Sequence, residues 1–249
     1  MFVYKDFGGI KTKDNKTIKK NMIIRSSCFY DLTDEELELI KSFNLKEVID
    51  LRTNTEIKEK PDYILNDVKY LSCPLFKESH AGVTHEVAND MLSVLFNMPG
   101  LATIYQGIVS NDYSIEMIKK VMNEIVLGDN YPVLFHCSAG KDRTGIIAFL
   151  TLYLLNVDYE TIMADYLEIN EKNKELADKF YAYAKTKTDD DSKAVKAKLL
   201  YLVDRSYIEA ALDKINELYG SLDNFIENKL EIDRMEIEFF RKRCLTKEE

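Results

Sequence analysis

The sequence contains no tryptophan, and its four cysteines are widely spaced at positions 28, 73, 137 and 244. That spacing excludes the dense disulfide framework of a small secreted protein, so reduced thiols are expected. No apolar run approaches the roughly 20 residues of a membrane span, so stable membrane insertion is not expected. The first residues, MFVYKDFGGIKTKDNK, lack the apolar core of a signal peptide. The chain as given is therefore expected in the cytoplasm, and secretion would require a leader removed ahead of it.

Acidic residues outnumber basic ones, which gives a formal net charge of −9. A general nucleic-acid binder usually carries a basic field, so nucleic acid is not an expected partner. Residues 1–25 are the exception, with seven Lys or Arg against two Asp. A solvated hairpin or loop accounts for this local excess, because isolated charge runs are usually surface features.

Short apolar runs alternate with helical patterns over the first 155 residues. Strands are predicted at 22–26, 46–52, 68–75 and 131–137, and helices at 31–44, 114–128 and 145–155. The strand at 131–137 is the most apolar, so we expect it at the centre of the sheet. This alternation predicts an α/β fold with a mostly parallel central sheet flanked by helices.

Helix boundaries are marked by capping residues. Thr33 is a predicted N-cap with Glu36 closing a capping box, and Ser221 and Asp233 are predicted N-caps of later helices. Helical patterns dominate from Tyr159 to the C-terminus, broken by a charged loop at 185–193. We read residues 1–249 as one domain with a helical insertion around 77–112 and a helical C-terminal part.

The predicted insertion holds two ambiguous features. The apolar cluster within residues 89–109 fits a core helix or, alternatively, a lid over a functional site. His80 and His85 are spaced closely enough to suggest a metal pair, but no Cys or acidic cluster lies in register, so loop histidines are the preferred interpretation and no metal is predicted.

The segment PVLFHCSAGKDRTGIIAFL, residues 132–150, places a cysteine between two core-forming runs. Ligands of a parallel sheet bind beyond the C-terminal ends of its strands, which is where Cys137 lies. A helix starting near Thr144 would point its N-terminus, together with the loop amides, at one concavity suited to a tetrahedral anion. The same field would stabilise a thiolate at Cys137.

These residue types suit phosphoryl transfer to cysteine. Cys137 would attack phosphorus, and Arg143 would clamp two phosphate oxygens. Thr144 Oγ could hydrogen-bond the cysteine sulfur and ease its departure, and His136 could order the loop. The predicted phosphate-binding residues are Ser138, Ala139, Gly140, Lys141, Asp142 and Arg143.

Each residue also has a plainer reading. Cys137 could be a buried structural thiol, although a loop with three adjacent charges is a poor place for burial. Lys141 could be either a solvated lysine or a substrate contact. The run AGKDRTG superficially resembles a nucleotide-binding P-loop, but Phe135 stands where the first glycine is needed and Asp142 where Ser or Thr binds magnesium, which excludes that reading.

The sequence His136-Cys137, five residues, then Arg143 resembles the signature of cysteine-dependent protein tyrosine phosphatases. The fuller HCSAGKDRTG resembles a subgroup of mainly bacterial tyrosine and lipid phosphatases. The segments KDFGGI, IIRSSCFYDLTDEE, VIDLRTNTEIKEKPD, DYLEIN and YIEAALDKINELYGSLDNFI resemble that subgroup in the same order. The resemblance therefore covers nearly the whole chain.

The general acid is the least determined part of the site. Many members of the larger family use an aspartate on a loop beginning Trp-Pro-Asp, which this tryptophan-free chain lacks in its usual form. Asp142 within the loop and Asp50 at the end of the 46–52 strand are the two candidates. The resemblance favours Asp142, whereas Asp50 could equally form a structural ion pair with Arg52.

The resemblance implies hydrolysis of phosphotyrosine in proteins, with phosphoserine, phosphothreonine or phosphoinositides as further substrates. It also gives Lys141 a role in binding highly phosphorylated lipid headgroups. We expect a monomeric enzyme that needs no cofactor. The alternatives are a phosphoinositide phosphatase, a catalytically weak phosphate-binding module and a rhodanese-like sulfurtransferase.

Overall fold

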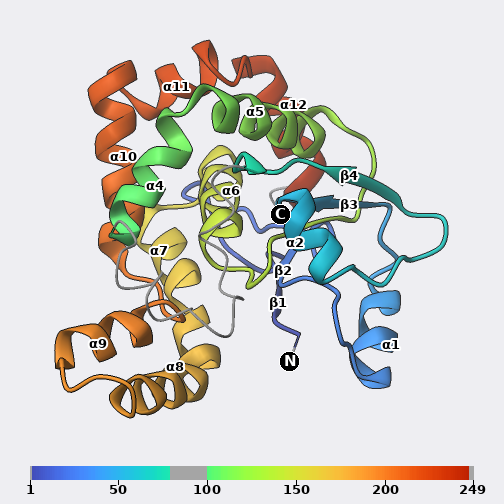
Figure 1. The fold of residues 1–249 in the computed structure, drawn as a ribbon. Helices are drawn as coiled ribbons and strands as arrows, with labels where there is room; N and C mark the ends of the chain where they lie inside the picture. The colour runs from blue at the N-terminus through green and yellow to red at the C-terminus, as the bar shows by residue number, and fades with distance from the viewer. Residues whose placement is uncertain (1, 79–99, 247–249) are drawn as a thin grey trace.

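The computed structural model describes residues 2–78 and 100–246 (Figure 1). Its strands are β1 (Tyr4–Asp6), β2 (Ile23–Ser26), β3 (Glu47–Asp50), β4 (Lys69–Ser72) and β5 (Val133–His136). They form one sheet in the spatial order β1-β2-β5-β3-β4, with only β1 antiparallel to its neighbour. The central position predicted for the 131–137 strand is confirmed, and all four β5 residues are buried. A strand enclosed on both faces and both edges is mostly apolar, as Val133, Leu134 and Phe135 are here.

The basic N-terminal stretch is only partly the predicted hairpin. Residues 11–17 fold back through an antiparallel bridge between Lys11 and Thr17. Ahead of them, β1 adds an edge strand that the charge pattern did not predict.

Alternate residues of the strands face two separate cores, as the period of two along a strand requires. Ile24, Val48 and Leu134 face the smaller core, which α1 (Asp34–Ser42) covers. Ile23, Ile49 and Phe135 face the larger core, to which most of the remaining helices contribute. The predicted α/β fold with helices on both faces is confirmed (Figure 1).

The remaining helices are α2 (Asn54–Glu59), α4 (Leu101–Ser110), α5 (Asp112–Leu127), α6 (Asp142–Leu154), α7 (Tyr159–Leu167), α8 (Ile169–Lys185), α9 (Asp191–Leu199), α10 (Arg205–Tyr219), α11 (Leu222–Asn228) and α12 (Arg234–Cys244). In Figure 1, α4 lies alongside α10, and the α8–α9 pair projects at the lower left. This pair has a small core of its own, built from Ala184, Ala194, Ala197 and Leu200.

The helix starts follow the capping residues closely. Thr33 and Glu36 form the predicted capping box, and Ser221 and Asp233 cap α11 and α12. The break at 185–193 is shorter than predicted, because α8 continues to Lys185 and α9 begins at Asp191.

Two helices near the sheet edge differ from the sequence prediction. Helix α6 begins at Asp142 rather than near Thr144, so its first turn includes the charged residues of the signature. Helix α2 was not predicted, although Thr53 and Glu56 form a full capping box at its start. That Ser/Thr-x-x-Glu spacing was visible in the sequence, but six residues are too few for a helical periodicity to show.

Only part of the insertion predicted around 77–112 can be compared with the structure. Residues 101–110 are helical, and α5 begins at Asp112. His80, His85 and residues 89–98 of the lid prediction lie outside the described residues. Within the described ranges, none of the helices combines the length and apolar character that crossing a membrane requires.

Candidate active site

Three parallel strands end at one edge of the sheet and bring the site together. The register pairs Ser26 with His136 and Asp50 with His136, so the segments that follow β2, β3 and β5 leave the sheet side by side. Cys137 is the first residue after β5, as the sequence predicts. We call residues 137–143 the cysteine loop.

Glycines allow this loop to pack tightly. Gly140 has a φ of +69°, and a Cβ there would lie 2.6 Å from the carbonyl oxygen of Ser26. Only glycine fits both that conformation and that approach. The loop is thereby held against the end of β2 and leads directly into α6. The N-cap position of α6 is Lys141, whose side chain makes no capping hydrogen bond, so the first-turn amides are not satisfied by it.

Cys137 is more deeply buried than the charged sequence around it suggested, with only 3% of its surface exposed. The reasoning that three charges would keep the loop exposed is wrong, because the charges are themselves buried in pairs. Lys141 is 1% exposed and Arg143 is 7% exposed, and each has an acidic partner. The solvated-lysine reading of Lys141 is wrong for the same reason.

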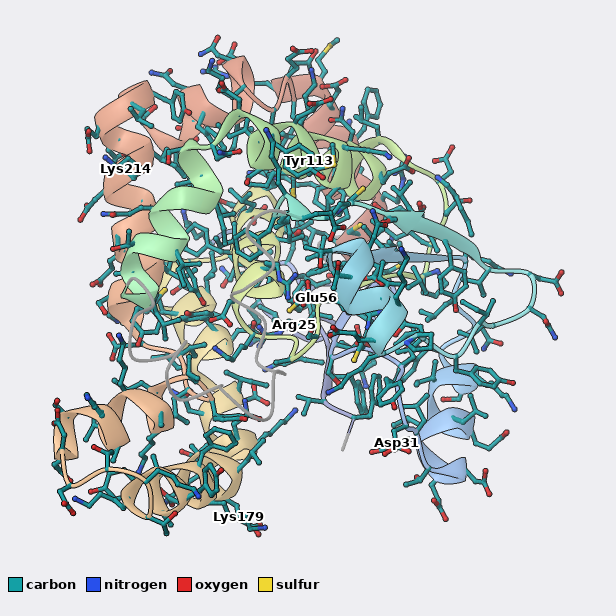
Figure 2. All side chains as sticks on the ribbon, in the orientation of Figure 1. Arg25, Asp31, Glu56, Tyr113, Lys179 and Lys214 are labelled. Atoms are coloured by element: carbon teal, nitrogen blue, oxygen red, sulfur yellow. The ribbon has the colours of Figure 1, made fainter. Side chains whose placement is uncertain are left out.

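Arg143 is clamped by a carboxylate that the sequence analysis missed. Its Nη1 and Nη2 donate to the two oxygens of Glu56, at 2.7 and 2.6 Å, and Glu56 projects from α2 (Figure 2). Ser138 Oγ also donates to Glu56, at 2.6 Å. The amide of Thr53 donates to the same carboxylate as part of the capping box of α2. Glu56 therefore joins the cysteine loop to α2.

This clamp shifts both partners toward their charged forms. Burial opposes the charge on Glu56, but hydrogen bonds and attraction from Arg143 outweigh it and lower the pKa of Glu56 to about 2. Burial likewise opposes the charge on Arg143, and Glu56 raises the pKa of Arg143 above its usual value. The pair is fully ionised at neutral pH.

The clamp leaves one edge of the guanidinium available. Arg143 has five N–H groups, of which two bond Glu56 and one reaches the Leu51 carbonyl at 3.4 Å. Among the described residues, its Nε–H and second Nη2–H have no acceptor. Those two donors lie on one edge of the fork, which is the geometry that binds two oxygens of a phosphate.

Asp142, the favoured general acid, is held by partners on two sides. Its Oδ2 lies 2.6 Å from Lys141 Nζ, and its Oδ1 accepts a hydrogen bond of 2.8 Å from the Tyr105 hydroxyl of α4. The carboxylate remains 18% exposed. It therefore combines a fixed position with access to a bound molecule.

Asp50, the other candidate acid, is engaged by Arg52. The Arg52 guanidinium is fully buried and donates to both oxygens of Asp50, at 2.7 to 3.1 Å, and to Asp62 at 2.7 Å. The structure therefore contains the Asp50–Arg52 ion pair that the sequence analysis gave as one alternative for Asp50. Both Asp50 oxygens accept hydrogen bonds from the Arg52 side chain, and the acid role of Asp50 stays a prediction beside this ion pair.

His136 lies against the same cluster. Its Nε2 is 3.2 Å from Asp62 Oδ2, and its ring stacks on Phe29. Burial disfavours the charged ring, but Asp50 and Asp62 outweigh this effect and raise the pKa of His136. Potential metal-ligand atoms of Asp50, Asp62 and His136 do lie within 4.8 Å of one another. Because the Arg52 guanidinium bonds both carboxylates and the His136 ring lies beside them, the cluster fits a buried ion-pair network better than a cation site.

Two further predictions concern sulfur. Thr144 Oγ1 is buried and has no hydrogen-bond partner among the described residues, so the bond predicted from it to Cys137 is not formed in this structure. All four cysteines are free. Cys28 contacts the loop through its backbone, because its amide donates to the Ser138 carbonyl at 3.3 Å.

The chain is similar in sequence to proteins that are named phosphatases. A protein from Cupriavidus necator that is named as a tyrosine-protein phosphatase is 27% identical to this chain over 234 residues. The match covers 92% of this chain and 81% of the relative. The triple specificity protein phosphatase PtpB of Mycobacterium tuberculosis is 25% identical over 250 residues, covering 85% and 86%. The catalytic core of the PP-IP phosphatase SIW14 from S. cerevisiae superposes with a TM-score of 0.33 at 18% identity, covering 79% of this chain and 89% of that one.

A family comparison covers more of this chain than any of these individual relatives does. The tyrosine phosphatase family matches residues 4–246, which include every element from β1 to α12. With a buried cysteine directly after the central strand and an arginine clamped six residues later, this chain belongs to the tyrosine phosphatase family.

Proposed function

We propose that this phosphatase hydrolyses phosphate monoesters through a cysteinyl-phosphate intermediate on Cys137. The observation that carries the proposal is the state of Arg143. Its guanidinium is fixed on one edge by Glu56, while two donors on the other edge have no acceptor among the described residues. A buried, pre-oriented cation beside a cysteine and an uncapped helix N-terminus is a site for a tetrahedral dianion.

In the first step, the Cys137 sulfur attacks phosphorus and forms the S–P bond as the bond to the leaving oxygen breaks. The loop amides and Arg143 hold the three equatorial oxygens, where charge is spread in the transition state. Asp142, when protonated, gives its proton to the leaving oxygen, so the alcohol departs neutral.

In the second step, water attacks the phosphoryl group on sulfur. Asp142, now ionised, accepts a proton from this water as the S–P bond breaks and the Cys137 thiolate is restored. Inorganic phosphate is released. Both steps use the same carboxylate in opposite roles, which fits its partial exposure beside the loop.

We infer that phosphotyrosine in proteins is the principal substrate, with phosphoserine, phosphothreonine and phosphoinositides as further substrates. The name of the Cupriavidus necator relative supports phosphotyrosine as a substrate, and the triple specificity in the name of PtpB supports more than one class of substrate. The net charge of −9 disfavours adsorption to an anionic membrane, which argues against phosphoinositides as the main substrate. We also infer a single catalytic domain that acts as a monomer.

Hydrolysis of p-nitrophenyl phosphate by the native protein, Cys137→Ser and Cys73→Ser tests the proposed nucleophile. Cys73 is buried beyond the end of β4 and serves as the matched thiol control. We expect no turnover from Cys137→Ser, native-like turnover from Cys73→Ser, and no transfer of sulfur from thiosulfate to cyanide by any of them. Activity retained in Cys137→Ser, or no phosphate release by the native protein, would refute the proposal.

Side-by-side assays with phosphotyrosine, phosphoserine and phosphothreonine peptides and with phosphoinositides in mixed micelles test the substrate range. We expect the highest kcat/KM for phosphotyrosine peptides. A phosphoinositide preference would assign the enzyme to lipid headgroups instead. Tight binding of phosphopeptides without turnover would identify a binding module.

A further inference from the structure

A chain of buried hydroxyl groups ends on Asp142. The Tyr105 hydroxyl donates to Asp142 Oδ1 at 2.8 Å, and it lies 2.7 Å from the Tyr166 hydroxyl. Tyr105 belongs to α4, Tyr166 to α7 and Asp142 to the start of α6. Their exposed fractions are 0% for Tyr105 and 2% for Tyr166. Three helices therefore converge on the carboxylate proposed as the acid.

The packing around the chain fixes its geometry. The Tyr166 ring lies so close to Gly145 that a Cβ there would be 2.8 Å from the ring edge. Tyr105 is packed edge-on against the Tyr166 ring and also contacts the ring of Tyr207. Gly145, the last residue of the signature segment, thus leaves the room that lets Tyr166 reach Tyr105.

We propose that Tyr105 is a positioning residue for the phosphatase reaction, holding the Asp142 carboxylate in place, and that Tyr166 in turn holds Tyr105. This inference rests on the proposed role of Asp142 as general acid. Lys141 restrains the second oxygen, at 2.6 Å. Lys141 would also be drawn toward a bound phosphate dianion, because opposite charges attract. Tyr105 carries no charge, so it can hold the carboxylate whether or not substrate is present.

The chain can serve both protonation states of the acid. When Asp142 is ionised, Tyr166 donates to Tyr105 and Tyr105 donates to Asp142. When Asp142 is protonated on Oδ2, its Oδ1 still accepts from Tyr105, so the same chain holds both states and the proton stays available to the leaving oxygen. Burial, reinforced by the Asp142 charge, raises the pKa of Tyr105 and of Tyr166 well above the usual range, so both remain neutral.

The test measures kcat and KM of Tyr105→Phe with two substrates whose leaving groups differ in basicity. Phosphotyrosine has a basic leaving oxygen that needs protonation, and p-nitrophenyl phosphate does not. For Tyr105→Phe we expect kcat/KM on phosphotyrosine to fall by about 10-fold, because kcat/KM reports only the first step and a mispositioned acid loses much of its effect there. The kcat/KM on p-nitrophenyl phosphate should fall no more than about threefold, since its leaving group needs little acid catalysis in that step. KM should be unchanged on both substrates.

A double mutant shows whether Tyr105 acts through Asp142. If it does, adding Tyr105→Phe to Asp142→Asn should change kcat by less than about twofold, because the two residues share one effect. Tyr166→Phe should lose less than Tyr105→Phe, with the same substrate dependence. Tyr207→Phe is the matched control: it removes a hydroxyl from a ring packed on Tyr105 that does not belong to the chain, and it should behave like the native enzyme.

Native-like kinetics in Tyr105→Phe would overturn the inference, as would equal losses on both substrates or a full additional loss in the Asp142→Asn background. If Tyr105→Phe lowers the thermal unfolding temperature strongly, Tyr166→Phe decides the question by the same substrate comparison. Failure of the proposed function gives a different result, because Asp142→Asn would then leave phosphotyrosine turnover unchanged or Cys137→Ser would remain active.

Discussion

Glu56→Gln isolates the clamp on Arg143, because it removes one charge and nearly no volume. The native carboxylate is 2% exposed and bonds both Nη atoms of Arg143. A glutamine offers one acceptor oxygen, and its NH₂ group must face a guanidinium N–H. Arg143 would then stay buried with its charge uncompensated.

The magnitude follows from the ionisation of Glu56. Its pKa falls from 4.5 to about 2 despite burial. Since one pKa unit is worth about 1.4 kcal/mol, the folded state stabilises the ionised carboxylate by about 3 kcal/mol. Removing one partner of a buried ion pair lowers the free energy of unfolding by a similar amount, about 3–5 kcal/mol. For a chain of this length, 3 kcal/mol lowers the unfolding temperature by about 6–12 °C.

Thermal unfolding followed by circular dichroism measures this loss across pH. The native pKa of Glu56 is depressed, so its contribution is fully present above pH 4.5 and is lost as pH falls toward about 2. The difference between native protein and Glu56→Gln should therefore be constant from pH 8 to pH 5 and shrink below pH 4.5. At pH 7, kcat/KM for p-nitrophenyl phosphate should fall by about 100-fold, because Arg143 loses its fixed orientation.

Glu59→Gln provides the matched control, since Glu59 is an exposed residue at the end of the same helix. It should shift the unfolding temperature by less than about 1 °C. A Glu56→Gln shift no larger than that of Glu59→Gln, or a difference that grows as pH falls below 4.5, would refute the reasoning. Unchanged kcat/KM would show that Arg143 does not depend on Glu56 for its orientation.

Two further predictions concern the packing of the cysteine loop. Gly140→Ala should destabilise the protein by about 1–3 kcal/mol in urea unfolding, because Gly140 has a positive φ and its Cβ would lie 2.6 Å from a backbone oxygen. The control is Gly107→Ala on the open face of α4, which should leave the stability unchanged. Equal urea midpoints for the two variants would contradict the packing argument. Hydrogen peroxide should join Cys137 and Cys28 in a disulfide, because the Cys28 amide donates a hydrogen bond to Ser138, the residue after Cys137. The two thiols lose two electrons, and the peroxide is reduced to two water molecules. Peptide mapping that shows Cys137 joined instead to Cys73 or Cys244 would refute this pairing.

The sequence alone determined the order of the main elements and predicted the nucleophile. Short apolar runs and capping residues depend on neighbours only a few positions away, which is why β2 to β5 and the starts of α1, α11 and α12 were predicted. The cysteine and arginine of the signature are likewise separated by only six residues. Strand β1 and helix α2 were missed, because three and six residues carry too little pattern.

Only the tertiary structure decided what surrounds the cysteine loop. Glu56 pairs with Arg143 across 87 positions, and Tyr105 reaches Asp142 across 37. No local pattern contains such pairs, because they are set by which strand ends meet at one sheet edge and which helices pack above it. The contact with Glu56 also explains why Arg143 can be buried with its charge. The sequence therefore predicted the reacting groups, whereas the fold determined the partner of Arg143, since a buried charge needs a counterion and Glu56 comes from a distant segment.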